Sequence, residues 1–167
     1  MIRITDRTLS CLDGLPRDRG ELLRFLALLI QTNPGAVEMS ERVFRLLSPL
    51  PEYSSYVLRI ERVKDVVNYP DITEFICNDV SAGMDGRVRA EVLLNNVNDI
   101  GIVDDYANCA KVRILGMDDT LCGDYQQTFA RLKNIFHGDI EFCPTDRYHC
   151  ATALAAEWIT SGGGGIL

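Results

Sequence analysis

The sequence predicts an α/β fold with a mainly parallel sheet, on two observations. Short β-branched or apolar runs alternate with longer segments of helical periodicity along the 167 residues, which is the pattern of repeated strand and helix units. Counting these units gives seven strands and the start of an eighth, so a closed barrel of eight strands is the natural arrangement. Such barrels run to about 250 residues, and we therefore expect a shortened or incomplete one.

The first half of the chain predicts four strands and two helices. The strands are expected at residues 2–4, 36–39, 56–60 and 74–77. Residues 20–32 (GELLRFLALLIQT) are strongly apolar with helical spacing, which indicates a half-buried helix. Ser40 followed by Glu41 begins a second helix, and Pro49 and Pro51 end it.

The second half predicts strands at residues 88–94, 112–115 and 140–143, with helices over 124–136 and 150–160. The third, fourth and fifth strands start only about 15 to 18 residues apart, whereas a strand, two loops and a mean helix need about 22. Some central helices must therefore be missing or reduced. Residues 166–167 follow four glycines and either begin an eighth strand or form a frayed tail. We expect a single domain over residues 1–167, which could end before the eighth strand is complete.

Charge and composition exclude several classes of partner. The formal net charge is −7, so no overall basic field attracts nucleic acid or anionic lipid. No apolar run reaches the roughly 18 residues of a membrane span, and the N-terminus lacks the apolar stretch of a signal peptide. The expected compartment is the cytoplasm, where the six cysteines stay reduced.

Four segments then carry a resemblance to one family. Residues 4–9 (ITDRTL) resemble its first strand, and residues 36–39 resemble its second, with Glu38 at the strand end. Residues 112–115 and 119–123 (DTLCG) are similar to its sixth strand and following turn. Residues 140–153 (IEFCPTDRYHCATA) resemble its seventh-strand motif without a gap. The family is that of the pyruvate-carboxyltransferase-like TIM barrels, which includes 2-isopropylmalate synthase and homocitrate synthase, and the nitrogenase-type homocitrate synthase is the member most resembled.

The resemblance implies an acyltransferase that condenses acetyl-CoA with a 2-oxo acid in a Claisen reaction, using a divalent metal to polarise the oxo acid. It implies catalytic roles for Glu38, Asp13 and Thr120, and substrate binding by Asp119 and Arg7. The metal ligands would be Asp13 and Cys143. Structural roles remain open for some of these residues. Glu38 could stabilise the dipole of the following helix, and Thr120 could cap a helix.

The chain departs from the family pattern where the family performs its chemistry. Ser10 stands at the position of the catalytic arginine, and Cys11 at that of the metal-binding aspartate. A three-residue shift would place Asp13 there instead. Cys143 and Thr145 replace the two histidine ligands. A pair of thiols suits zinc rather than Mg²⁺ or Mn²⁺, so the family metal is doubtful.

Two functions therefore remain open. One is the homocitrate synthase-like enzyme, and the other is a non-catalytic, degenerate barrel that acts as a binding or assembly subunit. We also expect a homo-oligomer or pairing with a second subunit, because an eighth strand of two residues would leave the first and seventh strands with unpaired edges.

Overall fold

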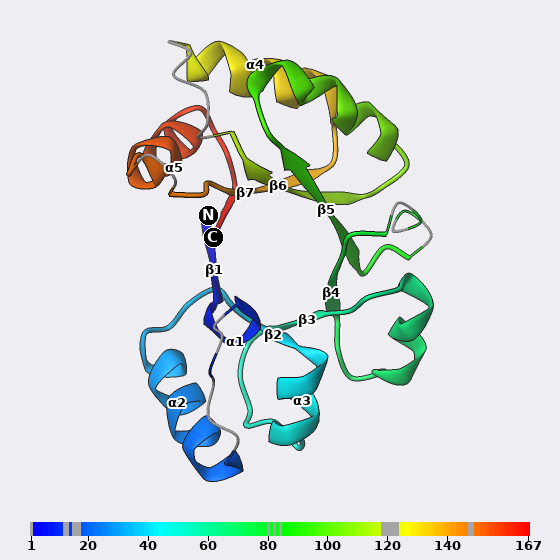
Figure 1. Cartoon of the computed structure of the whole chain (residues 1–167), viewed down its shortest axis with the longest axis vertical. Coiled ribbons are helices and arrows are strands. Elements are labelled where there is room, and N and C mark those ends of the chain that lie inside the picture. Colours follow the sequence, from blue (N-terminus) through cyan, green and yellow to red (C-terminus); the bar gives the residue numbers. More distant parts are fainter. Residues whose placement is uncertain are drawn as a thin grey trace.

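Eight parallel strands close into a barrel in the computed structural model, and the helices lie on its outside (Figure 1). The structure describes residues 2–11, 14, 18–79, 81, 83, 85–117, 124–146 and 149–167. The strands follow one another around the ring in chain order, and each neighbouring pair is parallel. The predicted α/β class and the shortened TIM-type barrel are therefore confirmed.

The elements lie close to their predicted positions. The strands are β1 (Arg3–Arg7), β2 (Ala36–Ser40), β3 (Tyr56–Arg59), β4 (Glu74–Cys77), β5 (Val88–Leu94), β6 (Lys111–Gly116), β7 (Asp139–Cys143) and β8 (Gly165–Ile166). The helices are α1 (Thr8–Cys11), α2 (Arg19–Gln31), α3 (Glu41–Leu47), α4 (Tyr125–Ile135) and α5 (Ala151–Thr160), with the 3₁₀ helices η1 (Val63–Asn68) and η3 (Val97–Tyr106). The largest shift is in β1, which begins one residue later and ends three residues later than predicted.

Side-chain caps fix where the helices start. Asp18 accepts the backbone N–H of Glu21 at 3.0 Å and begins α2. Ser40 accepts the N–H of Val43 at 3.4 Å and begins α3, as the sequence predicts. Asp124 caps α4 in the same way. A cap satisfies one of the backbone donors that the first helical turn leaves without a partner.

The barrel is shortened in its central connections. Only the 3₁₀ helix η1 joins β3 to β4, and η3 joins β5 to β6. Among the described residues, no α-helix lies between β3 and β6. This confirms the prediction, drawn from strand spacing, that some central helices are missing or reduced.

Two aromatic side chains on α4 and α5 pack these helices against β7. The ring of Phe129 contacts those of Phe142 and Trp158, with centroids 5.1 and 5.2 Å apart and near-perpendicular planes. All three side chains are buried. Edge-to-face pairs of this kind add stabilisation to the burial of apolar area.

The two residues of β8 complete the ring. Gly165 and Ile166 pair with Arg3 and Ile4 of β1 on one side and with Glu141 and Phe142 of β7 on the other. The expectation that β1 and β7 keep unpaired edges was therefore wrong, because two residues are enough to hydrogen-bond both neighbours. Gly163 lets the chain enter this strand, since a Cβ atom there would lie 2.1 Å from the ring of Trp158.

The outer face of β1 is open to solvent. Ile2 and Ile4 are 47% and 55% exposed and line a groove of about 880 Å³ that runs along this strand.

Five of the cysteines fall within the described residues, and all five are free thiols. No described helix is long and apolar enough to cross a membrane.

Candidate functional site

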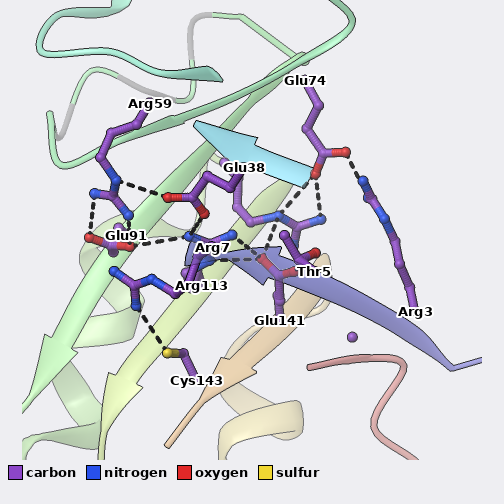
Figure 2. A network of polar contacts seen from close by, with 12 residues as sticks. Arg3, Thr5, Arg7, Glu38, Arg59, Glu74, Glu91, Arg113, Glu141 and Cys143 are labelled. Carbon is purple, nitrogen blue, oxygen red and sulfur yellow. Dashed lines mark hydrogen bonds and ion pairs between the residues drawn. The ribbon is translucent and has the colours of Figure 1, made fainter. Parts of the chain in front are cut away.

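The inside of the barrel is lined by charged side chains. Successive residues of a strand point to opposite faces, so Arg3, Thr5 and Arg7 of β1 all face inward. Figure 2 shows these side chains meeting acidic and basic partners from the other strands. Arg7 and Arg59 end their strands, which places them at the carboxyl-terminal mouth, where barrel enzymes hold their active sites.

Glu38 lies at the centre of this network and is completely buried. It forms ion pairs with Nη1 of Arg113 and with Nε of Arg59, the latter at 3.0 Å. It also accepts a hydrogen bond from the hydroxyl of Ser10 at 2.7 Å. Each of its oxygens therefore has a charged or hydroxyl donor.

Two further carboxylates complete the central network. Arg59 donates two parallel hydrogen bonds to Glu91, at 2.8 and 2.6 Å. Arg113 contacts Glu141 at 2.8 Å and Glu91 at 3.4 Å. Glu141 in turn accepts the hydroxyl of Thr5 at 2.6 Å. These contacts leave every buried carboxylate of the network with a direct donor.

The arginines keep the central carboxylates ionised. Burial alone would raise the pKa of Glu38, but Arg113, Arg59 and the Ser10 hydrogen bond outweigh it, so its pKa lies below the ordinary value. The pKa of Glu91 is also lowered: burial would raise it, but Arg59 outweighs this effect. A carboxylate that is held ionised and fully hydrogen-bonded is a weak proton acceptor.

Arg7 has a different set of partners at the mouth. Its Nε donates to the sulfur of Cys11 at 2.8 Å, and its Nη1 donates to the sulfur of Cys143 at 3.2 Å. Within the described part of the chain it has no direct carboxylate partner. Burial would lower the pKa of Arg7, but Cys143, Cys11 and Glu38 raise it, so the guanidinium stays charged. The mouth therefore carries a cation between two sulfur atoms.

The residues at the mouth do not fit the metal that the resemblance implies. Cys11 and Cys143 occupy two of the matched ligand positions, but both contact one guanidinium, whose charge repels a divalent cation. Thr145 is exposed. Burial raises the pKa of Cys143, against the effect of Arg7, and this favours the thiol over the thiolate that binds metal. Among the described residues no three His, Cys, Asp or Glu side chains cluster as a metal site.

The opposite wall of the mouth is apolar. Leu93 and Leu115 pair in register on β5 and β6, and each lies two residues beyond an inward-facing charged residue, Glu91 or Arg113. Both leucines therefore face the inside near the strand ends. Leu93 is 56% exposed, so a ligand in the mouth would meet a cation on one side and a hydrocarbon surface on the other.

The predicted site residues fall into two groups. The structure brings Arg7, Glu38 and Cys143 to the interior and mouth of the barrel. Asp13, Asp119 and Thr120 lie outside the described residues. Their catalytic, substrate-binding and metal-binding roles stay predictions.

Sequence reasoning missed most of the charged network, namely Arg3, Arg59, Glu74, Arg89, Glu91, Arg113 and Glu141. A signal for these residues was present in the strands themselves. Arg89 and Glu91 stand two apart in an otherwise apolar strand, and Arg113 and Glu141 sit in the middle of two more. Charges at alternate positions of buried strands indicate a polar barrel interior.

One backbone feature agrees with the seventh-strand resemblance. His149 stands where the motif has a glycine, and it adopts a φ of 57°. This left-handed region favours glycine. The imidazole of His149 is 92% exposed, so the residue serves the turn into α5 rather than the barrel interior.

Comparison with known proteins supports the fold and no particular activity. No protein-family model matches the chain, and no curated protein matches it in sequence. The carboxyl transferase domain of Rhizobium etli pyruvate carboxylase, solved with pyruvate, is similar over 99% of this chain, with a TM-score of 0.62 and 13% identity. A dipeptide epimerase from Methylococcus capsulatus, complexed with a Mg ion, is similar over 99% of this chain, with a TM-score of 0.61 and 12% identity.

This chain spans 39% of the first of these structures and 54% of the second. At such identities the likeness shows the fold alone. The chain is therefore a small TIM-type barrel, and at its carboxyl-terminal mouth Arg7 donates hydrogen bonds to the sulfur atoms of Cys11 and Cys143.

Proposed function

We propose that this chain binds a 2-oxo acid at the carboxyl-terminal mouth of the barrel and acts there as a non-catalytic, degenerate homologue of the acyltransferase barrels. The observation that carries the proposal is the position of Arg7, a charged guanidinium that contacts two sulfur atoms at 2.8 and 3.2 Å instead of a carboxylate. A bound carboxylate would replace these weak acceptors with strong ones.

The shape of the mouth supports a 2-oxo acid in particular. Such a ligand carries a carboxylate and an adjacent carbonyl, both of which accept hydrogen bonds from a guanidinium fork. Its side chain would extend toward Leu93 and Leu115. The similar carboxyl transferase domain was solved with pyruvate, which is itself a 2-oxo acid.

The free state of the five described cysteines supports a cytoplasmic location.

The central network argues for binding without turnover. Enolisation of acetyl-CoA requires a general base, and Glu38 is already paired with Arg113 and Arg59. Moving a proton onto Glu38 would sacrifice two buried ion pairs. The poor fit of the mouth to a divalent metal removes the second requirement of the family reaction.

The alternative is the homocitrate synthase-like condensation of acetyl-CoA with a 2-oxo acid. The seventh-strand motif and the glycine-like backbone of His149 favour it. In that case Glu38, Asp13 and Thr120 would act in catalysis, and Asp119 and Arg7 would hold the substrate.

Calorimetric titration with pyruvate and with 2-oxoglutarate, in EDTA, tests the proposed binding. We expect saturable binding of at least one acid and an affinity about tenfold weaker in Arg7→Gln, because a charge-assisted pair is lost. Arg131→Gln removes an exposed arginine from α4 and is the matched control. No saturable binding, or equal losses in both variants, would exclude the proposal.

A thiol-release assay with acetyl-CoA separates the two functions. We expect no turnover above the blank with either acid, with or without Mg²⁺ or Mn²⁺. Turnover that depends on the metal and is lost in Glu38→Gln would instead establish the acyltransferase, and it would leave the role of Arg7 in binding intact.

We also propose that the chain self-associates through the open face of β1. Water penalises exposed apolar area at about 25 cal/mol per Å², and Ile2 and Ile4 present such area beside a groove. We expect light scattering to show a dimer or larger species at micromolar concentration and a monomer for Ile4→Lys. A wild-type chain that stays monodisperse at 18.7 kDa would exclude self-association.

A further inference from the structure

A second pocket lies beside the mouth, on the same face of the barrel. It measures about 610 Å³ and lies against α3 and the carboxyl ends of β2, β3 and β4. The position of α3 beside β3 is visible in Figure 1. Arg7 does not line it, so it is separate from the 2-oxo acid site and does not depend on that proposal.

Hydrogen-bond donors from β2, α3, β3 and the residue after β4 line this pocket. Ser40, Arg42, Arg45, Arg59 and Asn78 contribute to its lining. Three of these are guanidinium groups, which present donors in a planar fork. The oxygen of Ser40 accepts the Val43 N–H, which leaves its own O–H available to donate.

The three arginines differ in how they are held. Arg59 is fixed by its two bonds to Glu91 and its ion pair with Glu38, so its position is set by the central network. Arg45 is 71% exposed and donates to the hydroxyl of Tyr69 at 3.3 Å. Arg42 is exposed and has no ion-pair partner among the described residues. Two exposed guanidinium groups, those of Arg42 and Arg45, therefore stand beside the carboxylate-bound guanidinium of Arg59.

Two carboxylates, Glu41 and Glu61, line the pocket beside the three guanidinium groups. Glu41 accepts the hydroxyl of Tyr69 and lies 3.7 Å from Arg45. An exposed ion pair at that distance is weak, so an anion of higher charge displaces it. Glu61 is exposed, and water screens its charge.

We propose that this pocket binds a phosphate group, either as inorganic phosphate or as the phosphate or pyrophosphate of a small ligand. A phosphate dianion offers three oxygens to donors that come from several elements, whereas a carboxylate offers two oxygens in one plane. The mixture of arginine forks, an amide and a hydroxyl matches the first geometry. The site adds a phosphate-binding function to a barrel face that already carries Arg7.

Titration of the ¹⁵N-labelled full chain with inorganic phosphate and with pyrophosphate, at constant ionic strength and pH 7.5, tests the site. We expect saturable amide shifts centred on Ser40, Arg42 and Asn78, with acetate giving none. Binding of inorganic phosphate should weaken as the pH falls below neutrality, because the dianion is then converted to the monoanion. Tighter binding of pyrophosphate would indicate a ligand with two linked phosphates.

Variants locate the binding. Arg42→Gln and Arg45→Gln should each weaken phosphate binding about tenfold, since each removes a charge-assisted donor. Arg24→Gln, at an exposed position of α2, should leave it unchanged. No saturable shift in the wild-type chain, shifts that centre elsewhere, equal binding of acetate, or equal losses in all three variants would each overturn the proposal. If a variant does not fold, the location of the amide shifts in the wild-type chain still tests the proposal.

Discussion

The two ends of the barrel interior treat their arginines differently. At the amino-terminal end Arg89 contacts Glu74 at 3.2 Å, Asp139 at 2.6 Å and Glu141 at 3.6 Å, and Arg3 contacts Glu74 at 2.6 Å. At the carboxyl-terminal mouth Arg7 contacts only two sulfur atoms within the described part of the chain. The amino-terminal end is a set of ion pairs; at the mouth Arg59 is paired with Glu38 and Glu91 in the same way, and Arg7 is the exception.

This difference suggests that the paired arginines stabilise the fold, whereas Arg7 serves binding. A buried charge that loses its partner is expensive, so the amino-terminal end and centre must keep all their members. Arg7 sits near solvent, and its sulfur acceptors cost little to exchange for oxygen. Arginine therefore stabilises the fold in one layer of the barrel, and two layers above it Arg7 would, as proposed, bind an anion.

The largest expected effect follows from removing the arginine that joins the central carboxylates. Arg113→Met leaves Glu38 and Glu141 without their main partner in a buried setting and should lower the free energy of unfolding by about 3–5 kcal/mol. Arg7→Met should lower the free energy of unfolding by far less. Urea denaturation of both variants measures the two losses, and equal losses would break the distinction between the two ends.

Acid should act on the amino-terminal end and centre first. The pKa values of Glu38, Glu74 and Glu91 are lowered in the folded chain, where burial opposes the shift and arginines outweigh it. Groups of this kind stabilise above the unfolded pKa, about 4.3 for Glu, and lose that contribution as pH falls through the folded values. We expect stability to be level from pH 7 to 5 and to fall below about pH 4.3. A chain equally stable at pH 3 would contradict this.

The apolar wall of the mouth should give a smaller, selective effect. Leu93→Ala is expected to weaken binding of a 2-oxo acid with a branched aliphatic side chain about fivefold, since roughly 1 kcal/mol of apolar contact is lost. Pyruvate, with its single methyl group, should bind almost as before. Leu28→Ala, which alters an exposed leucine on α2, is the control. Equal losses for both acids would show that Leu93 does not contact the side chain.

The smallest expected effect is that of added Mg²⁺ or Mn²⁺ on the melting temperature. Millimolar Mg²⁺ or Mn²⁺ should leave the melting temperature unchanged, because an ion that does not bind the native state cannot stabilise it. Differential scanning calorimetry measures this directly. A rise that disappears in Asp13→Asn would show that the family's metal site survives beside Arg7, and that Asp13 rather than Cys11 matches its aspartate.

The fold could be predicted from the sequence because local signals and the barrel agree. The alternation of apolar runs marks β4 and β5 to the residue, and Ser40 and Asp124 mark helix starts by their capping chemistry. The ring closure at β8 could not be predicted. Two residues carry too little pattern to distinguish a strand from a frayed end, and only the positions of β1 and β7 decide it.

The candidate site was predicted less well, for a physical reason. Resemblance drew attention to positions such as Cys11 and Cys143 as metal ligands, and the structure brings both of them to the guanidinium of Arg7. No spacing rule relates residues that lie 136 positions apart. The partners of Glu38 also come from β3 and β6. The ion pairs that keep this carboxylate ionised therefore form only in the folded barrel.

The shortness of β8 has a consequence for how the barrel opens. Backbone hydrogen bonds join β7 to β1 through residues 164–167 of the C-terminal segment: Gly165 and Ile166 pair with both strands, Gly164 accepts the N–H of Arg3, and Leu167 donates to Phe142. Beyond this segment the two strands are linked by side chains, Thr5 with Glu141 and Arg7 with Cys143. The register of β8 with each neighbour spans two residue pairs, against five between β5 and β6, so the amides of this junction should exchange with solvent before those of β5 and β6. A ligand held by Arg7 would sit on this junction, and its arrival would be read as slower exchange where the two ends of the chain meet.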